Sequence, residues 1–366
     1  TMVLLIISFS TLAVGFLARP LGGIVFGHFG DRIGRKRTLV VALMMMGVAT
    51  TLIGLLPTYS SIGIAAPLML VALRFVQGFA IGGQWGGAML LVTESAPADQ
   101  RGWYGAYAQA GAPIGVILAN LAFMGERSSM SDEAFMGWGW RLPFIASIVL
   151  IGISMYIQLK IEDTEAFRSL SDAKTDSDTA PQVVERSPVI VAIRKYPKRI
   201  MLAAGAFLSV QVTFYILIAF VIAYGMNSPS VELSRDTMLT AVLIAAAFMV
   251  PTQFYFSGLS DRIGRKSVYR WGAILTGVWG FALFPLIDTG SPILICVAIT
   301  MGLLFLGMQY GPQAAYFTEL FSTEVRYSGA SLGYQIGAIV GGALAPTIAV
   351  LLWNTFGIFY VSVYIL

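Results

Sequence analysis

The sequence has 366 residues, of which 57% are hydrophobic and only 11% are charged. In a soluble domain roughly a quarter of all residues are charged, so this composition excludes a soluble fold and predicts that lipid is the main solvent of the chain. The net charge of +4 does not indicate a nucleic-acid partner, because the basic residues fall between apolar stretches, where anionic lipid headgroups attract them.

Eleven mostly apolar stretches follow one another, each long enough to cross a hydrocarbon core of about 30 Å as a helix. They lie at 2–26, 39–56, 64–93, 103–125, 141–159, 200–225, 238–257, 268–288, 292–317, 328–352 and from 356 to the end. None alternates apolar and polar residues as a transmembrane β-strand does, so we predict an all-α polytopic membrane protein. Glycines inside the stretches, such as Gly22-Gly23 and Gly82-Gly83, predict helices that pack closely.

The basic loops predict the orientation of the chain. They lie at 32–37, 101, 160–199, 262–270 and 326, after the first, third, fifth, seventh and ninth stretch. Because loops rich in Lys and Arg stay in the cytoplasm, Thr1 is expected outside. Five stretches before a long central loop, and an abrupt stop at Leu366, suggest a twelve-helix protein that lacks helix one and part of helix twelve. We expect an N-terminal bundle at 1–160 (helices 2–6), a cytoplasmic central loop at 161–199 and a C-terminal bundle at 200–366 (helices 7–12).

Two motifs occur twice in the same order. DRIGRK stands at 31–36 and at 261–266, and a Thr-Glu pair with Arg seven residues after the Glu stands at 93–101 and at 318–326. Parallel repeats of this kind build transporters in two halves, with a substrate site between the halves near the middle of the membrane.

The repeated loops predict a cytoplasmic gate. Gly permits a tight turn, and Asp can cap a helix start or accept from an Arg. Glu94 with Arg101, and Glu319 with Arg326, lie at cytoplasmic ends of predicted spans and are expected to belong to this gate. Its predicted members are Gly27, Asp31, Arg32, Gly34, Arg35, Glu94, Arg101, Asp261, Arg262, Arg265, Glu319 and Arg326. The alternative is that the basic residues only set topology.

Several segments resemble a known transporter family. The loop at 27–36 resembles the signature between helices two and three of the major facilitator superfamily, and RFVQG at 74–78 resembles its helix-four signature. Four segments resemble the metabolite:H⁺ symporter family, most closely its shikimate-permease-like branch: FLARPLGGIVFGHFGDRIGRKR (16–37), GGQWGGAMLL (82–91), WGWRLPF (138–144) and FTELFSTEVRYSGASLGYQIGAIVGGALAP (317–346). The resemblance covers essentially the whole chain.

The resemblance implies the major-facilitator fold, two pseudo-symmetric six-helix bundles, and secondary active transport by alternating access in the cytoplasmic (inner) membrane. It implies proton symport of a small organic metabolite such as shikimate, α-ketoglutarate or another organic acid. The proton gradient would drive transport, so no cofactor, metal ion or nucleic-acid partner is expected, and the protein is expected to be monomeric. Members commonly carry Glu where this chain has Gln84, and an amide cannot take up and release a proton at physiological pH.

Arg19 and Arg74 lie inside predicted spans, where a charge is costly and therefore marks a functional candidate. The planar fork of Arg suits a carboxylate, which favours a small organic anion as substrate. The alternative is that each Arg locks helices together. Together with polar and aromatic residues in the spans, the candidates for substrate binding or coupling are Arg19, Arg74, Gln77, Gln84, Trp85, Tyr107, Gln109, Tyr215, Gln309, Tyr334 and Gln335.

Other functions stay open. A uniporter or a proton-coupled exporter of the same fold is favoured by Gln84, and a transporter-like nutrient sensor is weakly supported because the cytoplasmic segments are short. An enzyme is disfavoured, because the sequence has no metal-ligand spacing and no constellation of nucleophile and base.

Overall fold

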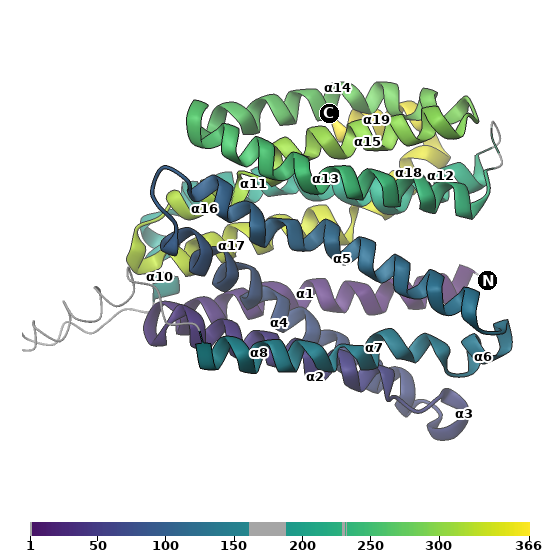
Figure 1. Ribbon diagram of the computed structural model, residues 1–366, viewed down its shortest axis with the longest axis horizontal. Coiled ribbons are helices and arrows are strands. Elements are labelled where there is room, and N and C mark those ends of the chain that lie inside the picture. The colour runs from purple at the N-terminus through teal and green to yellow at the C-terminus, as the bar shows by residue number, and fades with distance from the viewer. Residues whose placement is uncertain (1, 161–187, 229–230, 232) are drawn as a thin grey trace, which may run out of the picture. The chain divides into compact units, whose positions relative to one another are not determined.

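The computed structural model describes residues 2–160, 188–228, 231 and 233–366, and the side chains of 2–13 and of Arg35 are among those outside the description. Most of the predicted central loop at 161–199 therefore lies outside the described residues. The described chain consists of helices joined by short connections (Figure 1). This confirms the prediction of an all-α protein.

The helices of the first part of the chain are α1 (Met2–Ile33), α2 (Arg35–Gly54), α3 (Tyr59–Ile62), α4 (Ala65–Ser95), α5 (Arg101–Ser129), α6 (Asp132–Gly137), η1 (Gly139–Arg141), α7 (Leu142–Ala146) and α8 (Ile148–Lys160). The later ones are α10 (Pro188–Lys195), α11 (Pro197–Tyr215), η2 (Ile216–Phe220), α12 (Val221–Asn227), α13 (Arg235–Ile263), α14 (Arg265–Asp288), α15 (Pro292–Tyr310), α16 (Gln313–Glu319), η3 (Thr323–Val325), α17 (Arg326–Ala338), η4 (Ile339–Ala343), α18 (Ala345–Phe356) and α19 (Ile358–Ile365).

Within the described residues, nine helical stretches are long and apolar enough to cross a membrane. They correspond to the second to the tenth of the predicted stretches, while α1 covers the first. Three of the nine are not continuous α-helices. The stretch at 292–317 is interrupted at Gly311 and Pro312, because Pro has no N–H to continue the helix. The stretches at 200–225 and 328–352 contain the π-helical turns η2 and η4.

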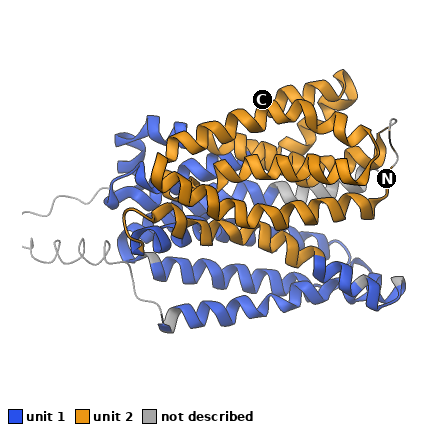
Figure 2. Ribbon diagram, turned by 45° about the horizontal axis from the view of Figure 1, so that its top comes forward, with its two compact units in different colours: residues 1–95, 121–204, 318–339 blue, residues 96–120, 205–317, 340–366 orange. Residues whose placement is uncertain are grey.

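The chain forms two compact units (Figure 2). Unit 1 comprises 1–95, 121–204 and 318–339, and unit 2 comprises 96–120, 205–317 and 340–366. The units cut across the sequence, because α17 groups with the N-terminal helices and the first part of α5 groups with the C-terminal helices. The division into two six-helix halves stays a prediction about the repeat.

In unit 1, glycines bring α1 and α4 into backbone contact. A Cβ at Gly22 would overlap the carbonyl oxygen of Phe79, and a Cβ at Gly82 would overlap that of Arg19. Without Cβ atoms the two backbones can touch, and this close approach adds dispersion contacts between the helices. Close packing of this kind is a main source of helix association in lipid. The prediction that glycines serve close helix packing is confirmed here.

In unit 2, α13, α14 and α15 pack on one another, and α19 packs on α14. The Ser362 hydroxyl donates to the carbonyl oxygen of Gly280 at 2.7 Å, which joins α19 to α14. Aromatic rings fill the space between η2, α12, α14 and α18, with the Tyr224 ring 5.1 Å from Trp353 and 5.2 Å from Phe284. These contacts hold the C-terminal helices together.

Candidate functional site

Residues from α1, α4 and α17 meet in unit 1 and form what we term the α1–α4–α17 cluster: Arg19, Gln84, Trp85, Tyr334 and Gln335. The contact of the Arg19 backbone with Gly82 places Arg19 beside α4, about halfway along both helices. The Gln335 side chain of α17 reaches the same point, because its amide nitrogen donates to the Gly82 carbonyl oxygen at 3.2 Å. Five of the predicted candidates therefore lie on three helices that pack together.

The Arg19 guanidinium lies over the Phe16 ring, 3.9 Å from its centroid. Its Nε is buried and has no hydrogen-bond partner within the described residues. A guanidinium carries five N–H donors, and an aromatic face satisfies its charge only in part. Arg19 is therefore available for an anionic ligand.

Two aromatic rings and two amides supply the other surfaces of the cluster. Trp85 stacks on Tyr334 with a centroid distance of 3.9 Å and an interplanar angle of 19°. The Oε1 of Gln335 is buried without a hydrogen-bond partner in the described part of the chain, while Gln84 is partly buried. The cluster thus brings a guanidinium group, a stacked pair of aromatic rings and two amide groups onto three packed helices.

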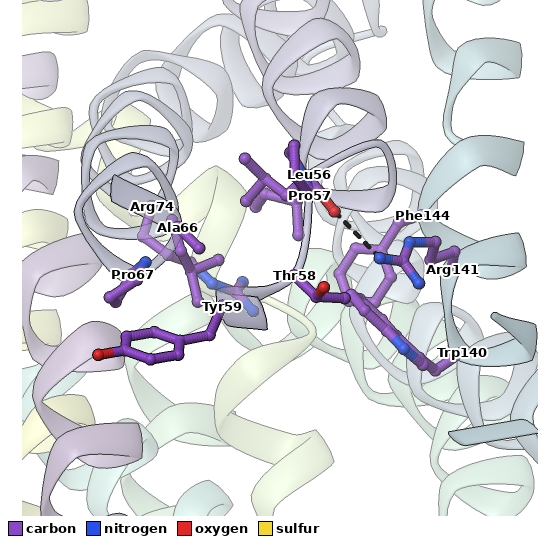
Figure 3. A pocket seen from close by; sticks show the side chains of 12 residues that line it. Leu56, Pro57, Thr58, Tyr59, Ala66, Pro67, Arg74, Trp140, Arg141 and Phe144 are labelled. Carbon is purple, nitrogen blue, oxygen red and sulfur yellow. Dashed lines mark hydrogen bonds between the residues drawn. The ribbon is translucent and has the colours of Figure 1, made fainter. Parts of the chain in front are cut away.

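Arg74 and Gln77 make a separate network with α2. An Arg74 Nη1 donates to Gln77 Oε1 at 3.1 Å, and Gln77 Nε2 donates to Thr50 Oγ1 at 2.6 Å. Arg74 also lines a pocket together with Arg141 (Figure 3). The side chain of Arg74 is therefore engaged with α2 and this pocket and is not hydrogen-bonded to the cluster.

The remaining candidates belong to unit 2, where two of them cross-link helices. The Gln309 amide accepts from Ser209 Oγ at 3.1 Å and donates to Thr276 Oγ1 at 3.1 Å, which ties α15 to α11 and α14. Gln109 donates to the Tyr310 carbonyl oxygen at 2.8 Å. These two buried amides therefore connect neighbouring helices, which is a structural role.

The two tyrosine candidates of unit 2 are more accessible. Tyr107 is 58% exposed and packs edge-on against Phe254, 4.8 Å away. Tyr215 is partly buried and contacts the ring of Phe214 at 5.7 Å. Each tyrosine stays a separate candidate for substrate binding.

The first copy of the repeated loop caps α17 in unit 1. Asp31 accepts hydrogen bonds from the Tyr327 N–H at 3.3 Å, the Ser328 N–H at 3.0 Å and the Ser328 hydroxyl at 2.7 Å. A carboxylate at a helix start satisfies free N–H groups and favours the helix dipole. Gly34 has a φ of 115°, a value that suits the tight turn after α1.

The second copy makes the same kind of contact in unit 2. Asp261 accepts from the Gly102 N–H at 2.9 Å and the Trp103 N–H at 2.8 Å, at the start of α5. Arg265 forms an ion pair with Asp261, and Gly264 has a φ of 93°. Each repeated loop therefore caps a helix from the other half of the sequence.

An ion pair connects the two copies of the second motif. Glu94 Oε1 pairs with Arg326 at 3.1 Å, so two of the predicted gate residues, one from each copy of the Thr-Glu and Arg motif, are in contact. The reason is that α17 packs against α4 and brings its first residue to the end of that helix. Tyr327, which the sequence did not single out, adds a buried hydroxyl that donates to the Gly83 carbonyl oxygen at 2.6 Å.

The other predicted gate residues are placed as follows. Gly27 is buried, and a Cβ there would lie 3.0 Å from Ser328 Cα. Arg32, Arg262 and Glu319 are exposed, and Arg101 is partly buried. The side chain of Arg35 lies outside the described residues.

The chain matches known proteins over nearly its whole length. Residues 5–346 match the family described as Major Facilitator Superfamily. The inner membrane metabolite transport protein YhjE of Escherichia coli (strain K12) is 40% identical over 98% of this chain and 80% of its own length. The shikimate transporter of the same strain is 37% identical over 95% of this chain and 78% of its own length.

A solved structure has the same fold. XylE, a proton:xylose symporter solved with 6-bromo-6-deoxy-D-glucose, superposes with a TM-score of 0.78 at 14% identity, covering 98% of this chain and 83% of that one. The resemblance of fold and family predicted from the repeated loop is confirmed, as is the prediction that the chain is not an enzyme. The chain belongs to the Major Facilitator Superfamily and is a multi-pass membrane transporter of metabolites.

Proposed function

We propose that the protein imports a small metabolite bearing a carboxylate across the inner membrane, driven by protons and working by alternating access. The observation that carries the proposal is the Arg19 guanidinium, which is partly buried in a span with its Nε unpartnered in the described structure. The names of two relatives support the membrane and the substrate class, because one is an inner membrane metabolite transport protein and the other is a shikimate transporter.

Arg19 would bind the carboxylate. A charged group within the hydrocarbon region needs a counter-charge or water, and the forked guanidinium donates two parallel hydrogen bonds to a carboxylate. The stacked rings of Trp85 and Tyr334 would contact the apolar face of the metabolite. The Gln335 Oε1, which has no hydrogen-bond partner among the described residues, and the Gln84 amide would accept from its hydroxyl groups.

The other candidates would play supporting roles. We propose that Arg74 and Gln77 respond to proton movement through their link to α2. Within unit 2, Tyr107 and Tyr215 stay candidates for substrate binding, and Gln109 and Gln309 would hold its helices together. The caps at Asp31 and Asp261 and the Glu94–Arg326 pair would stabilise one conformation of the cytoplasmic gate. Breaking them would release the other conformation, across a gap of a few kcal/mol.

Uptake into proteoliposomes tests the proposal. We expect the full-length protein to accumulate labelled shikimate or α-ketoglutarate under an inward proton gradient, and a protonophore to abolish accumulation. Failure to take up either acid, or any related organic acid, would overturn the substrate class.

Variants of Arg19 test the observation on which the proposal rests. A charge-assisted hydrogen bond is worth about 1.5–3 kcal/mol, so Arg19→Gln should weaken apparent affinity about tenfold to a hundredfold. Arg19→Lys should lose less affinity, because Lys keeps the positive charge although it lacks the planar guanidinium group. Arg235→Gln is the matched control, since Arg235 is exposed at the start of α13 in unit 2. Equal uptake by Arg19→Gln and the control would remove Arg19 from the site.

A uniporter or an exporter is the second candidate, and Gln84 is the observation that favours it. Replacing Gln84→Glu supplies a carboxyl group that can carry a proton. If protons are uncoupled in the natural chain, this variant should raise proton flux per substrate molecule, measured with a pH dye inside the vesicles. Substantial coupled proton flux in the unsubstituted protein would exclude the uniporter.

A further inference from the structure

A pocket of about 390 Å³ opens in unit 1 where the loop after α2 meets the beginnings of α4 and α7 (Figure 3). The residues that line it are Ile53, Leu56, Pro57, Thr58, Tyr59, Ala66, Pro67, Leu70, Arg74, Trp140, Arg141 and Phe144. The loop joins the outer ends of two spans, by the rule that basic loops stay inside. The pocket therefore lies at the outer surface of the membrane, away from the cytoplasmic gate.

Two guanidinium groups face this pocket. In Figure 3 Arg74 and Arg141 lie on opposite sides of the loop that carries Leu56, Thr58 and Tyr59. Of the described residues that line the pocket, none is Asp or Glu. Neither Arg forms an ion pair within the described part of the chain. Among the described residues, the pocket thus holds two positive charges that have no acidic partner.

Hydrogen bonds to the protein use only part of the donors on these groups. Arg141 donates from Nη1 to the Gly137 carbonyl oxygen at 2.9 Å and from Nη2 to the Leu56 carbonyl oxygen at 3.1 Å. Its guanidinium lies 4.7 Å from the centroid of the Trp140 ring. Arg74 donates to Gln77, but its Nε is buried and unpartnered among the described residues. These bonds fix both forks and leave N–H donors for an anion.

The rest of the lining is suited to lipid. Trp140 and Tyr59 are aromatic residues with polar tips, which favour the headgroup level of a bilayer. Ile53, Leu70 and Phe144 add apolar side chains to the lining. Basic pockets between transmembrane helices recognise phosphate headgroups, and an adjoining apolar wall can cover part of an acyl chain.

We propose that this pocket binds the phosphate of an anionic phospholipid from the outer leaflet, with Arg74 and Arg141 as the ligands. A zwitterionic lipid fits less well, because its cationic choline or amine would lie near two guanidinium groups. The proposal does not depend on the identity of the transported metabolite, so it can fail while the proposed transport activity holds.

Lipid titration tests the site on full-length protein purified and delipidated in detergent. We expect phosphatidylglycerol to raise the thermal unfolding midpoint, and phosphatidylcholine with the same acyl chains to raise it far less. Arg141→Gln should weaken the phosphatidylglycerol effect about tenfold in concentration, which corresponds to the loss of one charge-assisted hydrogen bond. Arg235→Gln, which removes an exposed charge from the outer side of unit 2, should leave the effect unchanged.

A second variant keeps the test decisive, because Arg141→Gln also loses two bonds that hold the loop. Thr58 lines the pocket and is the N-cap of α3, a position that both Asp and Asn suit. Thr58→Asp places a competing carboxylate beside the guanidinium groups and should suppress phosphatidylglycerol binding, whereas Thr58→Asn should keep it. Equal effects of the two lipids, or an undiminished effect in Thr58→Asp, would overturn the proposal. An equal shift from inorganic phosphate would show a free-anion site and overturn the lipid assignment.

Discussion

The two copies of DRIGRK begin from the same six residues and produce the same local structure, but their surroundings differ. In unit 1 Asp31 caps α17 with three accepted hydrogen bonds, one of them from the Ser328 hydroxyl. In unit 2 Asp261 caps α5 with two backbone bonds and also carries the ion pair to Arg265. The motif therefore supplies the cap in both units.

The residues next to each cap differ more than the caps themselves. Around the first copy, the Glu94–Arg326 pair and the Tyr327 hydroxyl bind α17 to α4, and the Tyr327 side chain is fully buried. Around the second copy, Trp103 at the start of α5 is 40% exposed. The comparison teaches that the repeat sets where helices are capped, while its neighbours set how firmly each cap is held.

The largest effect is expected from removing the cap carboxylates. Asp31→Ala should lower the free energy of unfolding by about 2–3 kcal/mol, because it removes an N-cap and strands partly buried donors. Asp261→Ala should cost about 1–2 kcal/mol, since the Trp103 N–H can bond to water instead but Arg265 loses its Asp261 partner. Unfolding in mixed detergent micelles measures both values. Asp31→Asn should recover part of the loss, and equal losses for the two Ala variants would contradict the comparison.

A smaller effect is expected from the two Glu residues of the repeat. Glu94→Gln should lower the free energy of unfolding by about 1–2 kcal/mol, because the Glu94 side chain is only 2% exposed and its loss leaves Arg326 without this partner. Glu319→Gln is the matched variant in the other copy and should not change stability measurably, because Glu319 is exposed. The same micelle titration compares them. A larger loss of stability for Glu319→Gln than for Glu94→Gln would contradict the inference that the contacts around the first cap are the firmer ones.

Sequence reasoning predicted the helical spans and the repeated loop well, because both depend on local patterns. Apolar runs long enough to cross the bilayer can be identified from length and hydropathy alone. A repeated hexapeptide indicates the position of the turns at Gly34 and Gly264. The breaks at η2 and η4 were not predicted, since a π-helical turn leaves no clear trace in composition.

Partners between distant residues could not be predicted in the same way. Asp31 and Ser328 are 297 positions apart, and Glu94 and Arg326 are 232 apart, so their contacts depend on how whole helices pack. For the same reason Arg74 was grouped with Arg19 from its intramembrane charge alone, whereas it hydrogen-bonds to Gln77 and lines the outer pocket with Arg141. The roles of both arginines in transport stay predictions.

The smallest effect is expected from the aromatic residue next to each cap. Tyr327→Phe removes the hydroxyl that donates to the Gly83 carbonyl oxygen and should cost about 1 kcal/mol, the usual net value of one hydrogen bond. The cost should not be larger, because a carbonyl in the middle of a helix already accepts one bond from its own helix. Trp103→Phe keeps an aromatic edge against Phe254 and should leave the thermal unfolding midpoint unchanged. A greater loss in Trp103→Phe would mean that the second cap depends on its neighbours as much as the first.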